Sequence, residues 1–204
     1  MQSDVCKPAL NMRSHLSAWG LACIALPGLA ADTYLLDGIH SVPVFEFTHL
    51  GLSTQSGRFD RVQGRIVLDR AGKSGSVALT IDASSLNMGH GTATPESPGF
   101  ELLKVREFSS IQFESNQLFF DDQLRVVAAA GHLTLLGVTR PLTVWVSRFS
   151  CAMSTSFKVE LCTGNITATV KRSEFGMLAY IPAISDEVKV LVPVEAYKQL
   201  AEAE

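Results

Sequence analysis

Short segments in which apolar and polar residues alternate follow one another along the chain from Thr33 onward. A two-residue period is the pattern of a β-strand, because successive side chains of a strand point to opposite faces of the sheet. The segments are rich in Val, Ile, Phe and Thr, which favour strands. The pattern predicts strands at 42–49, 64–68, 76–81, 110–118, 124–133, 141–149, 165–171 and 187–194.

The connections between these segments are typical of antiparallel hairpins. Leu50-Gly51, residues 71–73 and Leu136-Gly137 each contain a glycine that can adopt the positive φ of a hairpin turn. The sequence of residues 100–108 is compatible with about two turns of helix, which we expect to lie over one end of the fold. We therefore expect an all-β fold, an up-and-down antiparallel barrel of eight strands with a short helical cap. A two-sheet sandwich with a solid core has the same periodicity and stays open.

The alternation also predicts which side chains face the interior. Phe45, Phe47 and His49 share one side of their strand, and we expect this aromatic side to point inward. The same argument applies to Ile111 with Phe113, Leu133 with Leu135, and Val188 with Val190 and Val192. Eight strands closed into a barrel leave an interior that either fills with its own side chains or holds one small ligand.

The first thirty residues differ from the rest of the chain. Arg13 is followed by an uncharged, mostly apolar stretch at 16–26 and by small residues up to Ala31, which is the pattern of a secretory signal peptide. We expect cleavage after Ala30 or Ala31 and therefore assign residues 1–30 to the signal peptide and 31–204 to the mature domain. The true start is Met1 or Met12, and the alternative is a buried N-terminal helix.

Export would place the mature chain in an oxidising compartment, as a periplasmic or secreted protein. After removal of Cys6 and Cys23 with the signal peptide, Cys151 and Cys162 are the two cysteines that the sequence retains. An even pair in an exported chain predicts a disulfide, with two buried thiols as the alternative.

Composition and charge narrow the function classes. A chain of 204 residues with 18% charged residues and a net charge of -3 suits one globular domain, and it has no basic stripe that would indicate nucleic-acid binding. Its five histidines are scattered without metal-site spacing, and no nucleophile elbow, P-loop or dinucleotide fingerprint occurs. Asp37, His40 and Ser41 lie within one short segment, so we interpret them as turn and strand-end hydrogen bonding rather than a catalytic triad.

Several short motifs together resemble the YceI-like family of exported polyisoprenoid-binding proteins, over residues 34–198. No single piece is specific, but their order and spacing are, above all the hairpin that begins at Gly131. The pieces are DGIHS at 37–41, FEFTHLG at 45–51, SGRF at 56–59, GHLTLLGVTRPL at 131–142, KRSEFGM at 171–177 and SDEV at 185–188.

The resemblance implies a lipocalin-like barrel of eight antiparallel strands whose lumen holds an isoprenoid chain, such as that of a quinone or polyprenyl compound. It also implies that the protein has no motif-defined catalytic residue and requires no cofactor. A subset of the family has a cysteine pair before the KRSEFGM segment, which supports pairing Cys151 with Cys162. The chain departs from the family where Leu102-Leu103 replace a His-Leu pair and about six residues are missing near 108–111, so the closure of the mouth and the ligand length stay open.

We accordingly predict a non-catalytic carrier of an apolar lipid, with no metal site. The predicted ligand-binding residues are Phe45, Phe47, Phe113, Leu133, Val170 and Phe175, with His49 meeting a polar head group. Transient membrane contact and a homodimer are partner arrangements that the sequence leaves open. The alternatives are a ligand-free barrel that acts through its surface, in stress tolerance or beside a membrane redox chain, and a hydrolase or isomerase that uses His49 or His132 as base.

Overall fold

The computed structural model describes residues 31–89, 94 and 97–200. The predicted signal peptide lies outside these residues. The described chain is almost entirely β-structure, as predicted, with one short α-helix and two 3-10 turns. None of its helices is both long and apolar enough to cross a membrane.

The strands follow one another along the chain with few interruptions. Their bounds are β1 (Asp32–Leu36), β2 (Val44–His49), β3 (Ser53–Phe59), β4 (Val62–Asp69), β5 (Ser74–Asp82), β6 (Leu86–Asn87), β7 (Ser110–Phe120), β8 (Val126–Leu135), β9 (Val138–Met153), β10 (Glu160–Lys171) and β11 (Glu187–Lys198). The helical elements are α1 (Pro98–Leu102), η1 (Ala83–Ser85) and η2 (Arg172–Phe175).

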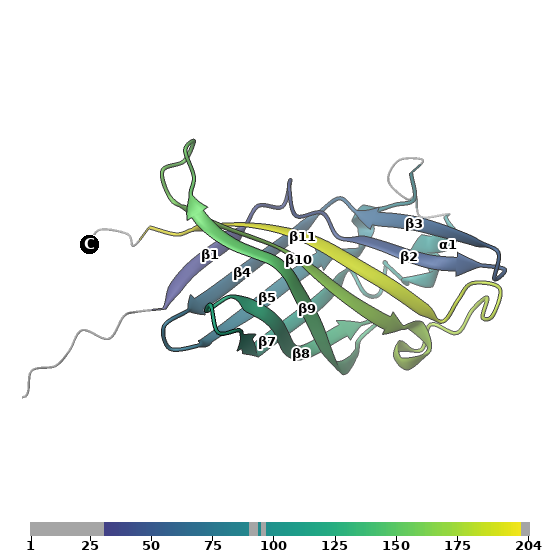
Figure 1. Ribbon diagram of the computed structural model, residues 1–204. Coiled ribbons are helices and arrows are strands. Elements are labelled where there is room, and N and C mark those ends of the chain that lie inside the picture. Colours follow the sequence, from purple (N-terminus) through teal and green to yellow (C-terminus); the bar gives the residue numbers. More distant parts are fainter. Residues whose placement is uncertain (1–30, 90–93, 95–96, 201–204) are drawn as a thin grey trace, which may run out of the picture.

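Eight of the strands close into a barrel (Figure 1), which confirms the predicted architecture. The ring runs β1-β4-β5-β7-β8-β9-β10-β11, every neighbouring pair is antiparallel, and β1 closes the ring by pairing with β11. In the closing pair, Tyr34 lies opposite Lys198 and Leu36 lies opposite Ala196. Closure leaves no free strand edge in the ring, which protects the barrel against edge-to-edge association.

The membership of the ring differs from the prediction in one strand. The predicted strand 42–49 is β2, which pairs with the first part of β11 and lies outside the ring, while the short β1 pairs with the last part. β2 continues into β3 and then β6, so these three strands extend the barrel wall beyond the rim at the end that also carries α1 (Figure 1). We call this the wide end, and the opposite end, around Tyr34 and the β9–β10 connection, the closed end.

The cap helix is shorter than predicted and begins earlier. Ser97 caps α1 by accepting a hydrogen bond from the backbone N–H of Phe100, and Pro98 occupies the first turn, where its missing N–H costs nothing. The helix ends at Leu102, and Lys104 has a positive φ that cannot continue a helix.

The buried apolar side chains form two clusters along the barrel axis. One surrounds Tyr34, Leu68 and Val194 at the closed end, and the other surrounds Phe59, Leu86 and Phe175 at the wide end. The interior of the barrel is therefore mostly apolar, which positions the cavity described next.

Candidate ligand cavity

A cavity of about 650 Å³ occupies the wide end of the barrel. Its volume lies in the range of small-molecule sites, roughly 300–1,000 Å³. The ring strands β5 and β7 to β11 contribute to the wall, together with β2, β3, β6, α1 and the loop that follows η2. Apart from Thr94, Ser97 and Arg172, the described residues of the wall are apolar or glycine. Such a wall suits a hydrocarbon ligand, because it offers almost nothing to a polar one.

Five of the seven residues predicted to bind a ligand line this cavity, namely Phe45, Phe47, Phe113, Leu133 and Val170. The other side chains that the alternation placed inward also line it, and these are Ile111, Leu135, Val188, Val190 and Val192. Contact of these residues with a ligand stays a prediction.

His49 and Phe175, the other two, do not line the cavity. His49 is the last residue of β2 and is exposed, although its backbone bridges to Ile184 in the loop that follows η2. Phe175 is 4% exposed and packs in the apolar cluster behind the wall rather than on its surface. The sequence alternation therefore placed Phe45 and Phe47 on the wall, but it failed at His49, the last residue of the strand, and at Phe175, which lies in η2 and not in a strand.

The aromatic side of the cavity depends on a close approach between β2 and β3. Phe45 lies opposite Gly57 in the strand register, and a Cβ at Gly57 would lie 2.5 Å from the Phe45 ring. The missing side chain lets this ring lie against β3, where its centroid is 5.5 Å from that of Phe59. Phe47 continues the aromatic wall, with its ring stacked 6.4 Å from that of Phe45.

Arg172, at the start of η2, is the one charged residue among the described residues of the wall, and it is 5% exposed. Its Nε donates to the carbonyl of Ser185 at 3.0 Å, and Nη2 donates to that of Ile184 at 3.1 Å. Both terminal nitrogens also donate to the carbonyl of Ala179, at 3.4 Å. Burial lowers the pKa of Arg172, and the nearby carboxylate of Asp186 opposes this shift.

A second, smaller cavity of about 70 Å³ continues the lumen toward the closed end. Its wall has no charged residue within the described chain. Four residues line both cavities, and these are Val77, Phe113, Val144 and Ile166. Their side chains mark the boundary between a large outer chamber and a small inner one.

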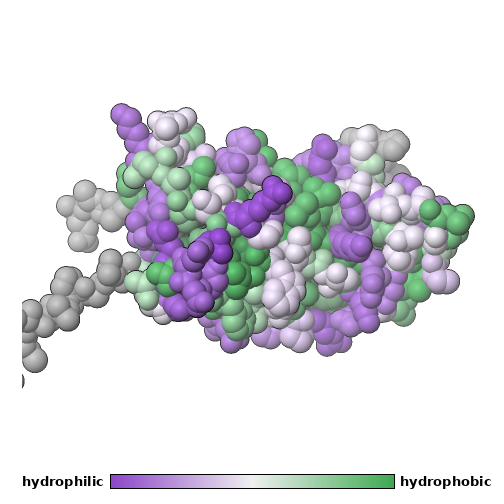
Figure 2. Space-filling view, in the orientation of Figure 1, coloured by the Kyte–Doolittle hydropathy of each residue, from purple (hydrophilic) through white to green (hydrophobic). Residues whose placement is uncertain are grey.

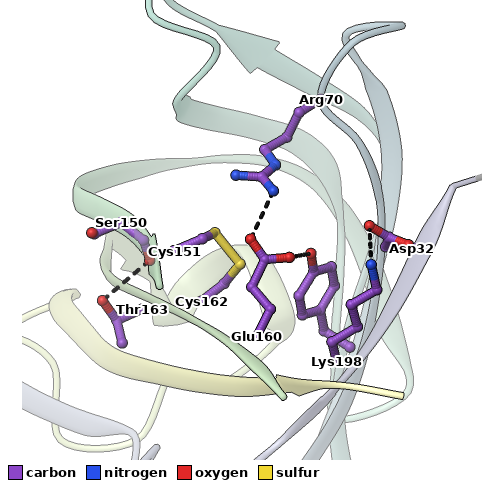
Figure 3. Close-up of a disulfide and its surroundings, with 9 residues drawn as sticks. Asp32, Arg70, Ser150, Cys151, Glu160, Cys162, Thr163 and Lys198 are labelled. Atoms are coloured by element: carbon purple, nitrogen blue, oxygen red, sulfur yellow. Dashed lines mark hydrogen bonds and ion pairs between the residues drawn. A yellow bond between two sulfur atoms is a disulfide. The ribbon is translucent and has the colours of Figure 1, made fainter. Parts of the chain in front are cut away.

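The closed end is held by a polar network (Figure 3). Glu160 accepts a hydrogen bond from the hydroxyl of Tyr34 at 2.7 Å and pairs with the guanidinium of Arg70 at 2.7 Å. Burial, and then the carboxylate of Glu160, raise the pKa of Tyr34. Lys198 pairs with Asp32 beside this network.

The disulfide between Cys151 and Cys162 lies at the same end (Figure 3), which confirms the predicted pair. The two cysteines are directly opposite in the β9–β10 ladder. Together with Glu160 they form one of the two described groups whose geometry could hold a metal ion, but their sulfurs bond to each other.

The other such group is Asp37, His40 and Glu195. The Asp37 carboxylate accepts hydrogen bonds from the backbone N–H of Ile39 and bonds Nδ1 of His40 at 2.8 Å, which lowers the pKa of Asp37 and raises that of His40. Ser41 is fully buried and exchanges hydrogen bonds with the backbone of Glu195. This is the turn and strand-end bonding that the sequence predicts.

His49 and His132, the bases of the enzymatic alternative, are both exposed and neither lines the cavity. Asp37, His40 and Ser41 do not line it either. The described wall therefore offers an acyl or proton-transfer reaction no histidine or carboxylate to act as base.

Exposed apolar side chains occur at both ends of the barrel, Met153 and Phe157 near the β9–β10 connection of the closed end and a larger group at the wide end, which the sequence reasoning missed. Leu50 and Leu52, in the β2–β3 turn, are 59% and 88% exposed, and Leu178 and Tyr180 follow η2 and are 64% and 59% exposed. The two loops are joined, since the Leu50 N–H donates to the carbonyl of Ala183 at 2.6 Å. Figure 2 shows apolar surface at the right-hand tip, where β2 and β3 end in Figure 1.

A family model described as the YceI-like domain matches residues 34–196. Among curated relatives, a UPF0312 protein of Vibrio campbellii is 33% identical over 138 residues, which are 65% of this chain and 72% of the relative. A UPF0312 protein of Pseudomonas aeruginosa is 28% identical over 174 residues, 84% of this chain and 89% of the relative.

Solved structures share the fold. BcnA of Burkholderia cenocepacia superposes with a TM-score of 0.62 at 19% identity, covering 78% of this chain and 98% of the other. A polyisoprenoid binding domain from Saccharophagus degradans superposes with a TM-score of 0.56 at 18% identity, covering 81% and 98%. A YceI protein of Campylobacter jejuni gives 0.61 at 20% identity, covering 75% and 90%.

Proposed function

The chain belongs to the YceI-like family, and on that premise we propose that it is a non-catalytic carrier that holds an apolar lipid of the polyisoprenoid type inside its barrel. The observation that carries this proposal is the cavity of about 650 Å³ with an apolar wall. The solved Saccharophagus degradans relative is described as a polyisoprenoid binding domain, and a quinone or polyprenyl compound would present the same kind of tail.

The two chambers favour a long, single-chain ligand over a compact one. The inner chamber continues the outer one past the boundary formed by Phe113, Val144 and two further residues. A linear tail can follow such a path, with each added unit burying more apolar surface at about 25 cal/mol per Å². Part of this gain is offset by the loss of conformational freedom when a flexible chain is ordered.

We further propose that the carrier works in the periplasm or outside the cell and loads its lipid during transient contact with a membrane. The disulfide supports an oxidising compartment. The exposed Leu50, Leu52, Leu178 and Tyr180 lie at the end of the barrel that holds the cavity. Apolar side chains on loop tips can enter the interface of a bilayer, which would bring the mouth of the cavity to the lipid.

The test is a titration of the delipidated mature protein with isoprenols of increasing length, from geraniol through farnesol to geranylgeraniol and longer. We expect the affinity to rise with each isoprene unit until the lumen is full, and then to stop rising. Isothermal calorimetry measures the dissociation constants, and a negative heat-capacity change would report burial of apolar surface. Absence of binding at every length, or an affinity independent of length, would contradict the carrier proposal.

A further inference from the structure

Arg172 is an unusual component of an otherwise apolar wall. Its guanidinium lies at the wide end, because its partners Ala179, Ile184 and Ser185 belong to the loop that contacts the β2–β3 turn. It is 5% exposed, so bulk water does not solvate its charge. An arginine stays protonated in proteins, and the wall therefore carries one fixed positive charge.

One N–H group of this guanidinium makes no hydrogen bond to the described residues. Arginine has five N–H groups, and the structure shows four bonds, one from Nε, one from Nη1 and two from Nη2. Nη1 has two N–H groups and makes one of these bonds, so its second N–H is available. All the acceptors are neutral backbone carbonyls, which satisfy the donors without neutralising the charge.

The carboxylate that acts on the charge of Arg172 is that of Asp186, and it is hydrogen-bonded to a different residue. Asp186 favours the charged form of Arg172, but no ion pair within 4.0 Å joins any described carboxylate to Arg172. The Asp186 oxygens accept instead from the backbone N–H and the hydroxyl of Ser173, at 2.8 and 2.7 Å. The charge on the wall is thus only partly compensated by the protein.

A bound hydrocarbon tail would increase the effect of the partly compensated charge on Arg172. Filling the outer chamber with hydrocarbon lowers the dielectric around the guanidinium, which strengthens the attraction of Arg172 for an anion. A hydrogen bond from a cationic donor to an anionic oxygen is roughly twice as strong as one between neutral groups. A neutral alcohol or quinone oxygen would accept the same N–H without compensating the charge.

We propose that Arg172 is a head-group site that takes an anionic oxygen, as a phosphate or carboxylate, at the end of the isoprenoid chain. This inference rests on the proposed carrier function and names the class of its cargo. With the head group at Arg172, the tail extends toward the boundary at Ile166 and into the inner chamber. The site orients the lipid as well as selecting it, because the described wall has no second charge that could hold the head group.

The experiment compares ligands that differ only in the head group. Geranylgeranyl phosphate, geranylgeranoic acid and geranylgeraniol are titrated into the wild-type protein at low salt and at a pH where both acids are charged. We expect the phosphate and the acid to bind at least about tenfold more tightly than the alcohol, since charge-assisted hydrogen bonds are the stronger ones. The ratio of phosphate to acid tells which anion the site prefers.

Variants connect that preference to the guanidinium. Arg172→Gln should reduce the preference for the anions to within about twofold, whereas Arg172→Lys, which supplies a smaller cation, should retain more of the preference than Arg172→Gln. Arg140→Gln is the matched control, because Arg140 bonds the carbonyl of Glu174 nearby but does not line the cavity. Asp186→Asn should increase the preference, since it removes the negative charge that opposes an anion. That increase remains measurable even if Arg172→Gln does not fold.

The outcomes separate the two proposals. If the alcohol binds as tightly as the two acids, the head-group site is wrong and the carrier function stands. If Arg172→Gln folds and keeps the full preference, or Asp186→Asn leaves the preference unchanged, the assignment to Arg172 is wrong. If no isoprenoid binds with any head group, the carrier function itself fails.

Discussion

The two ends of the barrel differ in structure, because one is cross-linked and the other encloses a cavity. At the closed end, Tyr34, Glu160 and Arg70 form a polar network, and a disulfide joins β9 to β10. At the wide end the side chains of the wall enclose a cavity of about 650 Å³. The closed end contains the cross-links and the wide end contains the space.

This difference indicates how the barrel stays folded although it contains a large cavity. Apolar groups around a void lose packing contacts, which destabilises the folded state. Closure of the strand ring, the polar network and the disulfide all act away from the void and offset that loss. We infer that stability and binding are largely separable along the barrel axis, and each prediction below challenges that separation.

The largest effect is expected at the wall of the wide end. Phe47→Asp places a carboxylate against the apolar tail, and burying an unpaired charge costs several kcal/mol, so isoprenoid affinity should fall by about 1,000-fold or more. Thr48→Asp is the matched control, because Thr48 is exposed on the opposite face of the same strand. Calorimetric titration measures both variants, and circular dichroism verifies folding. Unchanged uptake by a folded Phe47→Asp protein would remove Phe47 from the binding site.

Next in size is the disulfide at the closed end. Replacing Cys151 and Cys162 together by alanine should lower the free energy of unfolding by about 3 kcal/mol, because the cross-link restricts the unfolded chain. Isoprenoid affinity should stay unchanged. Chemical denaturation followed by titration of the same variant measures the two quantities. A fall in affinity that accompanies the loss of stability would show that the two ends are not separable.

The boundary between the chambers should set the length of the bound chain. Ile166→Ala enlarges the passage, so isoprenols longer than the wild-type optimum should bind about tenfold more tightly, as expected for burying two more CH₂ groups at about 0.8 kcal/mol each. Leu79 lines the outer cavity but not the inner one, and Leu79→Ala should leave the optimal length unchanged. The titration series of increasing length measures both. An identical optimum in wild type and Ile166→Ala would mean that the tail never reaches the boundary.

The smallest effect concerns Tyr34. Tyr34→Phe removes the hydrogen bond to Glu160 and should cost about 1 kcal/mol at neutral pH. Because the pKa of Tyr34 is raised in the folded state above its usual 10.0, the folded state holds the phenol proton more tightly, and stability should fall as pH rises above that value. Tyr34→Phe should make this alkaline decline shallower. Denaturation curves at increasing pH test this, and equal slopes would exclude Tyr34 as its source.

Much of the fold follows from local sequence. Strands inside the ring alternate between a core face and a solvent face, so their period is visible in the sequence. β3 was not predicted because its residues, such as Thr54 and Gln55, are polar and exposed and show no alternation. β1 was not predicted because its sequence, two polar residues followed by three apolar ones, shows no alternation. That β1 rather than β2 closes the ring depends on pairing with β11, which no local pattern specifies.

The same distinction applies to the site. Phe113, Leu133 and Val170 could be placed on the wall because alternation within a closed ring points to the lumen. Arg172 could not, since a charged residue after a strand ordinarily indicates a solvated turn, and its burial results from a loop that folds back over it. The Tyr34–Glu160 contact joins residues 126 positions apart, so only the tertiary structure brings the pair together.

The most direct test of the central claim is native mass spectrometry of the protein, purified from the compartment to which we propose that it is exported, followed by organic extraction of the released mass. The account predicts one polyisoprenoid molecule for each chain, with a length that matches the optimum of the titration series. An empty barrel that also takes up no added isoprenoid would contradict it and would favour a protein that acts through its surface.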